Sequence, residues 1–323
     1  MTTITTEQEG DGFYIAQFKS QDLAVFSYYV ESDKMAFLID PTFDTSMFMA
    51  HLEKRGATLK YIVLTHYHAD FLSAHTTLEY PIFMGPKSKS EANKFPLTEL
   101  EDGKGFSIGS INMVCVFTPG HTNESSCYIL QDSNKKDVCI FTGDTVFLGD
   151  VGRPDLASSH DVTKQDLAGW LFDSIQKLKK FDGEMRLYPG HGSGSACGKA
   201  IGAGNYCTLG KQKENNYGFK AENREDFIKQ VTDIAPPPPY FFHDAKLNHI
   251  GPGNFNEELK KANVPLGIEE FQKAASSGTI FDTRANPEGG IIRGSYWVHE
   301  KGPLTTWIPM ICTPDEPIVL IVE

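Results

Sequence analysis

The sequence lacks long apolar runs. None of its apolar stretches approaches the roughly 20 residues that a helix needs to span a bilayer, and the chain begins with the polar, acidic segment MTTITTEQEGDG. This segment has neither the basic start and apolar centre of a secretory signal nor the arginine-rich pattern of a transit peptide. We therefore expect a cytoplasmic protein with no membrane partner.

An excess of positive charge is also absent. The 323 residues include 42 Asp plus Glu against 30 Lys plus Arg, which gives a net charge of −12. Because such a surface repels nucleic acids and anionic lipids, we expect neither as a partner. The six cysteines show no paired spacing that would indicate disulfides or a zinc knuckle, so buried reduced thiols are predicted.

What the sequence does contain is four apolar, strand-like segments that each lead into a side chain able to bind a metal. They are Tyr61–Leu64 before THYHADF, Ile111–Phe117 before TPGHT, Val138–Phe141 before TGD, and Met185–Tyr188 before PGHG. If these strands lie side by side in one sheet, their ends bring five metal-competent residues to one rim, where loops often carry chemistry: His66, His68, His121, Asp144 and His191. A lone histidine is more often a structural residue, but this set indicates a metal centre.

Position 71 carries a phenylalanine where a two-metal hydrolase would need a histidine. Imidazole can bind a second cation and a phenyl ring cannot. The sequence therefore predicts a centre for one metal. From the residues alone, His68 stays a candidate for a further ligand, because it lies two residues from His66 on the same short loop.

The remaining pattern is typical of sheets covered by helices. Before the first metal motif, the sequence predicts strands at Phe13–Phe18, Ala24–Val30 and Met35–Ile39 and a helix at Thr45–Arg55. Another helix is predicted at Asp161–Lys180, with an apolar stripe that marks a core-facing surface. The consecutive prolines 236–239 favour an extended arm. Further on, the sequence predicts a helix at Ile268–Ala275 and strands at Thr279–Asp282 and Pro317–Val322.

The ordered motifs THYHADF, PGHT, GDTVFLGDVGRPD and YPGHGSGSACG resemble the metallo-β-lactamase superfamily, and within it the persulfide dioxygenases, also called sulfur dioxygenases. The segments GDTVFLGDVGRPD and PPPPYFFHDAKLNHIGPG are similar to those of dioxygenases fused to a rhodanese domain. This resemblance covers about residues 13–253. The tail, with IFDTR and GGIIRGSYWV, resembles the first half of a rhodanese domain in a shorter and less specific match.

The resemblance implies an α/β fold in three parts. These are an αββα sandwich in residues 1–240, a connector in residues 241–262 and an incomplete rhodanese-like segment in residues 263–323. The sulfur-carrying cysteine of a rhodanese opens a loop directly after a strand like Pro317–Val322, whereas Cys312 precedes this strand. We therefore expect that the segment does not transfer sulfur itself.

The resemblance also implies one Fe(II) per chain, held by His66, His121 and Asp144. Two neutral imidazoles and one carboxylate leave positions on iron for a substrate and dioxygen. Three further residues are expected to orient ligands or bound water through hydrogen bonds: His68, Asp70 and His191. The implied reaction oxidises a low-molecular-weight persulfide, such as glutathione persulfide, with O2 to sulfite and the parent thiol.

Two residues are candidates for substrate binding. Arg153 is predicted to bind a substrate carboxylate through its guanidinium group, and Tyr188 could donate a hydrogen bond nearby. The alternative for Arg153 is a salt bridge to Asp150 or Asp155 that stiffens the loop.

Cys197 follows the His191 loop and is a candidate for a sulfur relay. This role requires a stabilised thiolate, for which Lys199 is the nearest cation in the sequence. The alternative is an inert small residue in a tight loop.

Two other functions stay open. A thioester hydrolase of the glyoxalase II type shares the scaffold and a glutathione-like substrate, but it would normally use two metals, and Phe71 argues against it. A non-catalytic sulfur-relay module is disfavoured because His66, His121 and Asp144 are all present. Assembly as a homodimer is a further open alternative.

Overall fold

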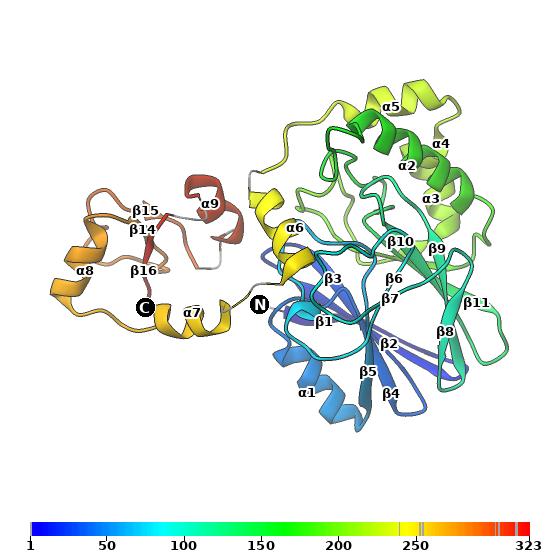
Figure 1. The fold of residues 1–323 in the computed structure, drawn as a ribbon, viewed down its shortest axis with the longest axis horizontal. Helices are drawn as coiled ribbons and strands as arrows, with labels where there is room; N and C mark the ends of the chain where they lie inside the picture. Colours follow the sequence, from blue (N-terminus) through cyan, green and yellow to red (C-terminus); the bar gives the residue numbers. More distant parts are fainter. Residues whose placement is uncertain are drawn as a thin grey trace.

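Two β-sheets stacked face to face form the larger part of the molecule in a computed structural model, which describes residues 2–238, 240–251, 253, 255–300, 302, 304–313 and 316–323 (Figure 1). The first sheet has seven strands in sequence order. They are β1 (Thr2–Gly10), β2 (Phe13–Ser20), β3 (Val25–Ser32), β4 (Met35–Ile39), β5 (Thr58–Val63), β6 (Ile82–Met84) and β7 (Leu97–Glu99). Neighbours from β1 to β4 are antiparallel, and those from β4 to β7 are parallel.

The second sheet has six strands in the order β13-β12-β11-β10-β9-β8. They are β8 (Gly105–Ile108), β9 (Ile111–Phe117), β10 (Ser126–Gln131), β11 (Asp137–Gly143), β12 (Arg186–Pro189) and β13 (Cys207–Thr208). Only β11 and β12 pair in parallel in this sheet as described, with Gly143 opposite Pro189. This register places the residues that follow the two strands next to each other.

The main core lies between the two sheets. Phe26 and Tyr28 of the first sheet pack with Met113, Phe141 and Tyr188 of the second, and all five are buried. Removing large apolar side chains from water is the dominant favourable term in folding, and each contributes roughly 1.5–3 kcal/mol. The two sheets are therefore held together by their inner faces, and the loops at their ends form one rim.

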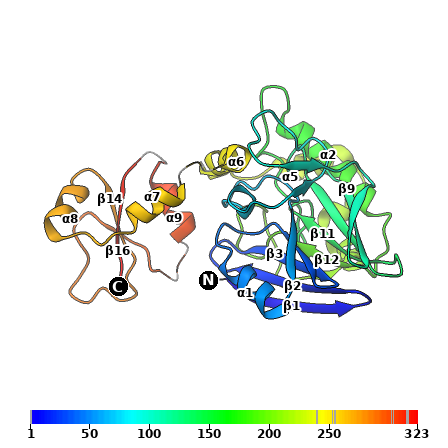
Figure 2. The same ribbon diagram turned by 60° about the horizontal axis from the view of Figure 1, so that its bottom comes forward.

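Helices cover the outer faces of both sheets (Figures 1 and 2). On the first sheet, α1 (Ser46–Arg55) buries Phe48 against Phe18 and Leu59. On the second, α2 (Lys164–Leu178) buries Leu171 and Ile175 in a cluster shared with the outer face of β11 and β12. The neighbouring helices are α3 (Leu209–Asn215), α4 (Tyr217–Lys220) and α5 (Arg224–Thr232). This layering confirms the predicted αββα sandwich.

Two element boundaries follow from local chemistry. Thr163 and Asp166 form a capping box, so α2 begins at Lys164 and not at Asp161. Gly56, with φ of 61°, ends α1 in the left-handed conformation that glycine adopts without steric cost.

The strand β1 was not predicted, because its polar residues show no apolar alternation and none of the nine is fully buried.

The four metal-motif segments do not share one sheet, the arrangement under which we expected their ends to meet. The first segment is β5 of the first sheet, whereas the other three are β9, β11 and β12 of the second. An apolar run identifies a buried strand but carries no information about its partners, which are set by long-range pairing. The motif residues still reach one rim, because the two sheets are stacked.

The C-terminal part lies beside the sandwich (Figures 1 and 2). Its elements are α6 (Tyr240–Ile250), α7 (Phe255–Ala262), α8 (Ile268–Ala275), β14 (Thr279–Asp282), β15 (Tyr296–Trp297), α9 (Leu304–Ile311) and β16 (Ile318–Ile321). The three strands pair in parallel in the order β15-β14-β16. The predictions of α8 and β14 are confirmed, and α9 was not predicted.

Within the described part of the chain, we find no helix whose length and apolar character would let it cross a bilayer.

Candidate metal centre

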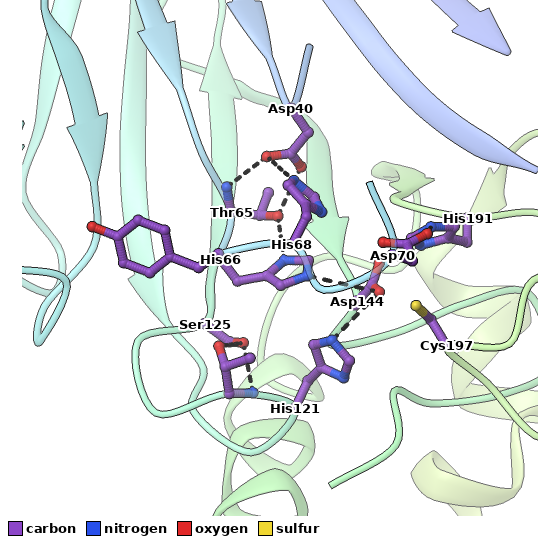
Figure 3. A network of polar contacts seen from close by, with 12 residues as sticks. Asp40, Thr65, His66, His68, Asp70, His121, Ser125, Asp144, His191 and Cys197 are labelled. Carbon is purple, nitrogen blue, oxygen red and sulfur yellow. Dashed lines mark hydrogen bonds and ion pairs between the residues drawn. The ribbon is translucent and has the colours of Figure 1, made fainter. Parts of the chain in front are cut away.

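His66, His121 and Asp144 point toward one another at the rim, as Figure 3 shows. They follow β5, β9 and β11, respectively. The Oδ2 atom of Asp144 lies 3.5 Å from Nε2 of His121 and 3.8 Å from Nε2 of His66. All three side chains are buried, and their ligand atoms lie within 4.8 Å of one another. Two imidazole nitrogens and a carboxylate oxygen at this spacing suit a transition metal.

Hydrogen bonds fix the tautomer of both histidines. The Nδ1 atom of His121 lies 2.9 Å from the carbonyl oxygen of Arg153, which can only accept, so Nδ1 carries the proton. The hydroxyl of Thr65 donates to a buried carboxylate and therefore accepts from Nδ1 of His66 at 2.9 Å. In both residues Nε2 is left with a lone pair, and both lone pairs face Asp144.

The charges at this group also suit a cation. Burial lowers the pKa of His66 and of His121, so both imidazoles are neutral. Burial would raise the pKa of Asp144, but His191 and the two other histidines outweigh it and hold the pKa well below its usual range. Among the described residues, Oδ2 of Asp144 has no hydrogen-bond partner although it is buried. An unpartnered buried carboxylate oxygen opposite two lone pairs is accounted for by a bound metal ion.

Asp40 supports the first motif, and the sequence analysis missed it. Its carboxylate accepts hydrogen bonds from the backbone N–H and the hydroxyl of Thr65, at 2.8 and 2.7 Å. Asp40 has φ of 49°, a strained conformation for a non-glycine residue, and such strain is common at functional sites. Its position directly after β4 and before Pro41 was the available sequence signal.

His68 lies outside the group of metal-competent atoms. Its Nε2 atom is 3.1 Å from Oδ1 of Asp40, and its ring stacks on Phe71 with centroids 4.2 Å apart. Neither ring nitrogen has a partner of hydrogen-bond geometry in the described ranges. The structure thus turns His68 away from Asp144.

His191, which was expected to orient a ligand or bound water, lies between two carboxylates. Its Nδ1 is 2.8 Å from Oδ1 of Asp144, and its Nε2 is 2.8 Å from Oδ2 of Asp70. Burial alone would lower the pKa of His191, but the two carboxylates outweigh it and hold the pKa well above its ordinary value. Both ring nitrogens are therefore committed to orienting Asp144 and Asp70.

Cys197 completes a second buried group with Asp70 and His191, whose ligand atoms also lie within 4.8 Å of one another. Burial, together with Asp70 and Asp144, raises the pKa of its thiol well above the usual value. Lys199 donates instead to the carbonyl oxygen of Asp233 at 2.8 Å. The condition that we set for a relay, a thiolate stabilised by Lys199, is therefore not met.

Arg153 forms the salt bridge that we considered as the alternative. Its Nε and Nη2 donate to the carboxylate of Asp155 at 2.7 and 2.9 Å. The guanidinium also donates to the carbonyl oxygens of Ala196 and Ala235. The side chain thus joins three segments of the chain, and its contact with a substrate stays a prediction.

The prediction for Tyr188 is corrected. Its ring is buried in the core between the sheets, stacked on Phe141. Its hydroxyl donates to Oε1 of Gln8 in β1 at 2.6 Å. The side chain points from β12 into the core, because successive residues of a strand face opposite sides of the sheet. The hydroxyl is therefore not presented to a substrate.

A cavity of about 850 Å³ lies between the sandwich and the C-terminal part. Asp70 and Phe71 of the metal loop line it on one side, and residues of α9 with Cys312 line it on the other. Asp70 is the outer end of the chain of contacts through His191 to Asp144. A ligand in this cavity would lie against the metal loop.

A family model described as the metallo-beta-lactamase superfamily matches residues 21–191, a range that includes His66, His121, Asp144 and His191. The chain belongs to the metallo-beta-lactamase superfamily. Members of this superfamily are usually enzymes, and the buried group His66, His121 and Asp144 is consistent with a metal-dependent one.

Curated relatives in the superfamily are named as hydrolases. The chain is 30% identical over 218 residues to PksB from Bacillus subtilis, a probable polyketide biosynthesis zinc-dependent hydrolase. The aligned region covers 63% of this chain and 85% of that protein. It is 33% identical over 153 residues to a hydroxyacylglutathione hydrolase from Brucella anthropi. This aligned region covers 46% of this chain and 53% of that protein.

Two solved structures share the fold. A metallo-beta-lactamase from Staphylococcus aureus superposes with a TM-score of 0.86 at 27% identity, over 97% of this chain and 92% of that chain. The structure of ETHE1 from Myxococcus xanthus superposes with a TM-score of 0.60 at 22% identity, over 73% of this chain and 98% of that chain. The first superposition includes the C-terminal part.

Proposed function

We propose that this protein is a mononuclear Fe(II) persulfide dioxygenase. It converts a low-molecular-weight persulfide RSSH, such as glutathione persulfide, with O2 and H2O to the thiol RSH and sulfurous acid, which ionises to sulfite. His66, His121 and Asp144 would hold the iron. When bound, Fe(II) would supply neighbouring positions for the persulfide sulfur and O2, which brings the two reactants together.

The observation that carries this proposal is that Phe71 and His191 leave no ligand free for a second metal. Phe71 contributes a ring and no ligand, and that ring is stacked on His68. Both nitrogens of His191 are taken by Asp144 and Asp70. The geometry therefore favours one metal with three protein ligands, a set that leaves open positions for two reactants.

The residues around this set have defined tasks. Thr65 and the carbonyl of Arg153 keep the imidazoles in the tautomer that presents Nε2. The His191 ring keeps Asp144 ionised and fixes the direction of its free Oδ2 atom. The burial of all these groups excludes water from the contacts and strengthens them electrostatically.

A thioester hydrolase is the second candidate, because Asp70, His191 and Cys197 form a second buried group near the first. The hydroxyacylglutathione hydrolase name of one relative is consistent with it. A second cation at that group would require His191 to release one of its two carboxylates. It would also require the thiol of Cys197 to ionise beside two carboxylates.

The rhodanese-like nature of residues 263–323 also stays a proposal, supported by the parallel sheet β15-β14-β16 and its helices. Cys312 precedes β16, so it does not stand where the sulfur-carrying cysteine of a rhodanese stands, directly after such a strand.

Two activities measured on the same anaerobically purified protein separate the candidates. We expect oxygen uptake and sulfite formation from glutathione persulfide, and no cleavage of S-lactoylglutathione. Asp144→Ala should abolish the oxygen uptake by removing one of the three ligands. Thioester cleavage without oxygen uptake would favour the hydrolase, and metal binding without either activity would favour a relay module.

A further inference from the structure

Asn248 of α6 is completely buried and makes several hydrogen bonds to the loop that carries the first metal motif. Its Nδ2 atom donates to the backbone carbonyl oxygens of His68 and Phe71, both at 2.8 Å. Its Oδ1 atom accepts from the backbone N–H of Ser73 at 2.9 Å. The side-chain amide therefore holds three backbone groups of one loop, about 175 residues away in sequence.

The loop depends on such side chains because residues 65–73 form no helix or strand. Buried backbone groups outside regular structure need other partners. Asp40 binds the N–H of Thr65 at the start of the loop, and Glu124 binds the N–H of Tyr67 at 3.0 Å in its middle. Asn248 binds the last part. These three side chains hold the loop through its backbone groups, and one of them, Asn248, comes from α6.

Asn248 holds the backbone of the two residues whose rings form a stack beside the metal-competent group. The two carbonyls that Asn248 holds belong to His68 and Phe71, whose rings stack on each other. The centroid of the His68 ring is only 4.3 Å from that of His66, a metal-competent residue. A modest change of the backbone at His68 would therefore bring a second imidazole of the same loop to the metal.

We propose that Asn248 is a positioning residue that keeps His68 out of the metal coordination sphere. By fixing the carbonyls of His68 and Phe71, it preserves their stack and leaves the metal with three protein ligands. This inference rests on the proposed ligand set of His66, His121 and Asp144. The family match ends at residue 191, so a helix outside the matched range completes the metal loop.

The position of α6 adds a consequence. Tyr240, in the first turn of the helix, lines the cavity next to the C-terminal part, and Asn248 lies two turns later. The helix therefore connects the wall of the cavity to the metal loop. A ligand or a movement that displaced α6 would act on the coordination of the metal through Asn248.

Asn248→Asp tests the proposal, because it keeps the size of the side chain but replaces its two N–H donors with an acceptor. We expect tighter iron binding, measured by competition with a chelator, because His68 adds an imidazole to the three protein ligands. In the Co(II)-substituted protein, we expect the visible absorption to weaken, because intensity falls as the coordination number rises. His68→Ala combined with Asn248→Asp should remove this spectral change.

Gln17→Glu is the matched control. Gln17 is also completely buried, and its Nε2 atom donates to the hydroxyl of Tyr28 and to the carbonyl oxygen of Asn205, neither of which lies in a loop with a metal ligand. We expect a comparable loss of thermal stability and an unchanged Co(II) spectrum. If Asn248→Asp does not fold, Asn248→Ser, which is too short to reach both carbonyls, takes its place.

The results distinguish this inference from the proposed function. A wild-type Co(II) spectrum and wild-type iron affinity in the Asn248 variants would overturn the positioning role. A spectral change that persists in the double variant with His68→Ala would overturn the role assigned to His68. Failure of the wild-type protein to bind metal would instead contradict the proposed function.

Discussion

The phenyl ring of Phe71 stacks on the imidazole ring of His68, with ring centroids 4.2 Å apart and planes 30° apart. Both rings are buried. Neither side chain of the stack is available to bind a second cation. Phe71 has no ligand atom, and the imidazole of His68 is turned toward Asp40. The contact therefore connects the choice of residue at position 71 to the number of metals.

Phe71→His should add a ligand where the site has none. Together with Asp70, the new imidazole would offer a second cation two ligands from one loop. We expect the variant to bind close to two Zn²⁺ per chain when it is reconstituted with zinc, measured by elemental analysis. Phe71→Leu, which removes the ring without adding a ligand, is the control and should remain at one.

Gly152→Ala should disturb the metal centre without changing any ligand. A Cβ atom at position 152 would overlap the backbone carbonyl oxygen of Asp144 and approach Nδ1 of His121 to 3.0 Å. Because two ligands would have to move, we expect metal affinity to fall at least tenfold in a chelator competition. Gly183→Ala is the control. The nearest atom to a Cβ at position 183 would be 3.3 Å away, so this variant should keep the metal affinity of wild type.

Arg153→Ala should mainly reduce stability. The guanidinium is buried and joins Asp155 to the carbonyl oxygens of Ala196 and Ala235. Leaving these acceptors unpartnered should lower the free energy of unfolding by about 3 kcal/mol, as measured by chemical denaturation. The exposed pair of Arg224 and Asp173 is the comparison, and Arg224→Ala should cost less than about 1 kcal/mol.

The same Arg153 variant also tests substrate binding. If the guanidinium anchored a substrate carboxylate, the KM for the persulfide would rise markedly while kcat stayed similar. Since most of its donors are already committed, we expect a KM within a few fold of wild type in steady-state oxygen uptake. A large increase in KM at unchanged stability would restore the direct role.

Stability should depend on pH through Glu31, far from the metal. Burial acts to raise the pKa of Glu31, but hydrogen bonds from Arg55 and Tyr29 outweigh it and lower the pKa overall. A lowered pKa in the folded state means that the stabilisation is present above about pH 4.3 and is lost as the pH falls through the folded-state value. Glu31→Gln should therefore cost about 1.5–3 kcal/mol at pH 7.

Denaturation of wild type and Glu31→Gln at two pH values checks this sign. The difference in the free energy of unfolding should shrink as the pH falls toward 3, because wild-type Glu31 then becomes neutral as well. A constant difference between pH 7 and pH 3 would show that the charge of Glu31 is not the source of the stabilisation.

The sequence was sufficient to predict the residues of the site that belong to local motifs. Each of His66, His121 and Asp144 directly follows an apolar strand, and the strand ends meet at one rim whichever sheet they belong to. The layered fold followed from the same alternation of strands and helices. The arrangement of the strands in two sheets did not, because pairing partners are set by contacts between distant segments.

The residues that hold the ligands in place were harder to find. Asp40 and Asn248 act on the metal loop from 25 and about 175 residues away, and neither belongs to a local pattern of metal ligands. Tyr188 was a candidate for substrate binding, but strand alternation directs its side chain into the core. Local spacing identifies ligands, whereas orientation and support require the three-dimensional structure.

The number and identity of the metals in active protein test the central claim most directly. Protein purified without oxygen should contain one iron per chain by elemental analysis, and a crystal structure of that material should show one cation at His66, His121 and Asp144. Oxygen uptake on glutathione persulfide should increase in proportion to the iron content. Two cations per active chain, the second bound by Asp70, His191 and Cys197, would contradict the account.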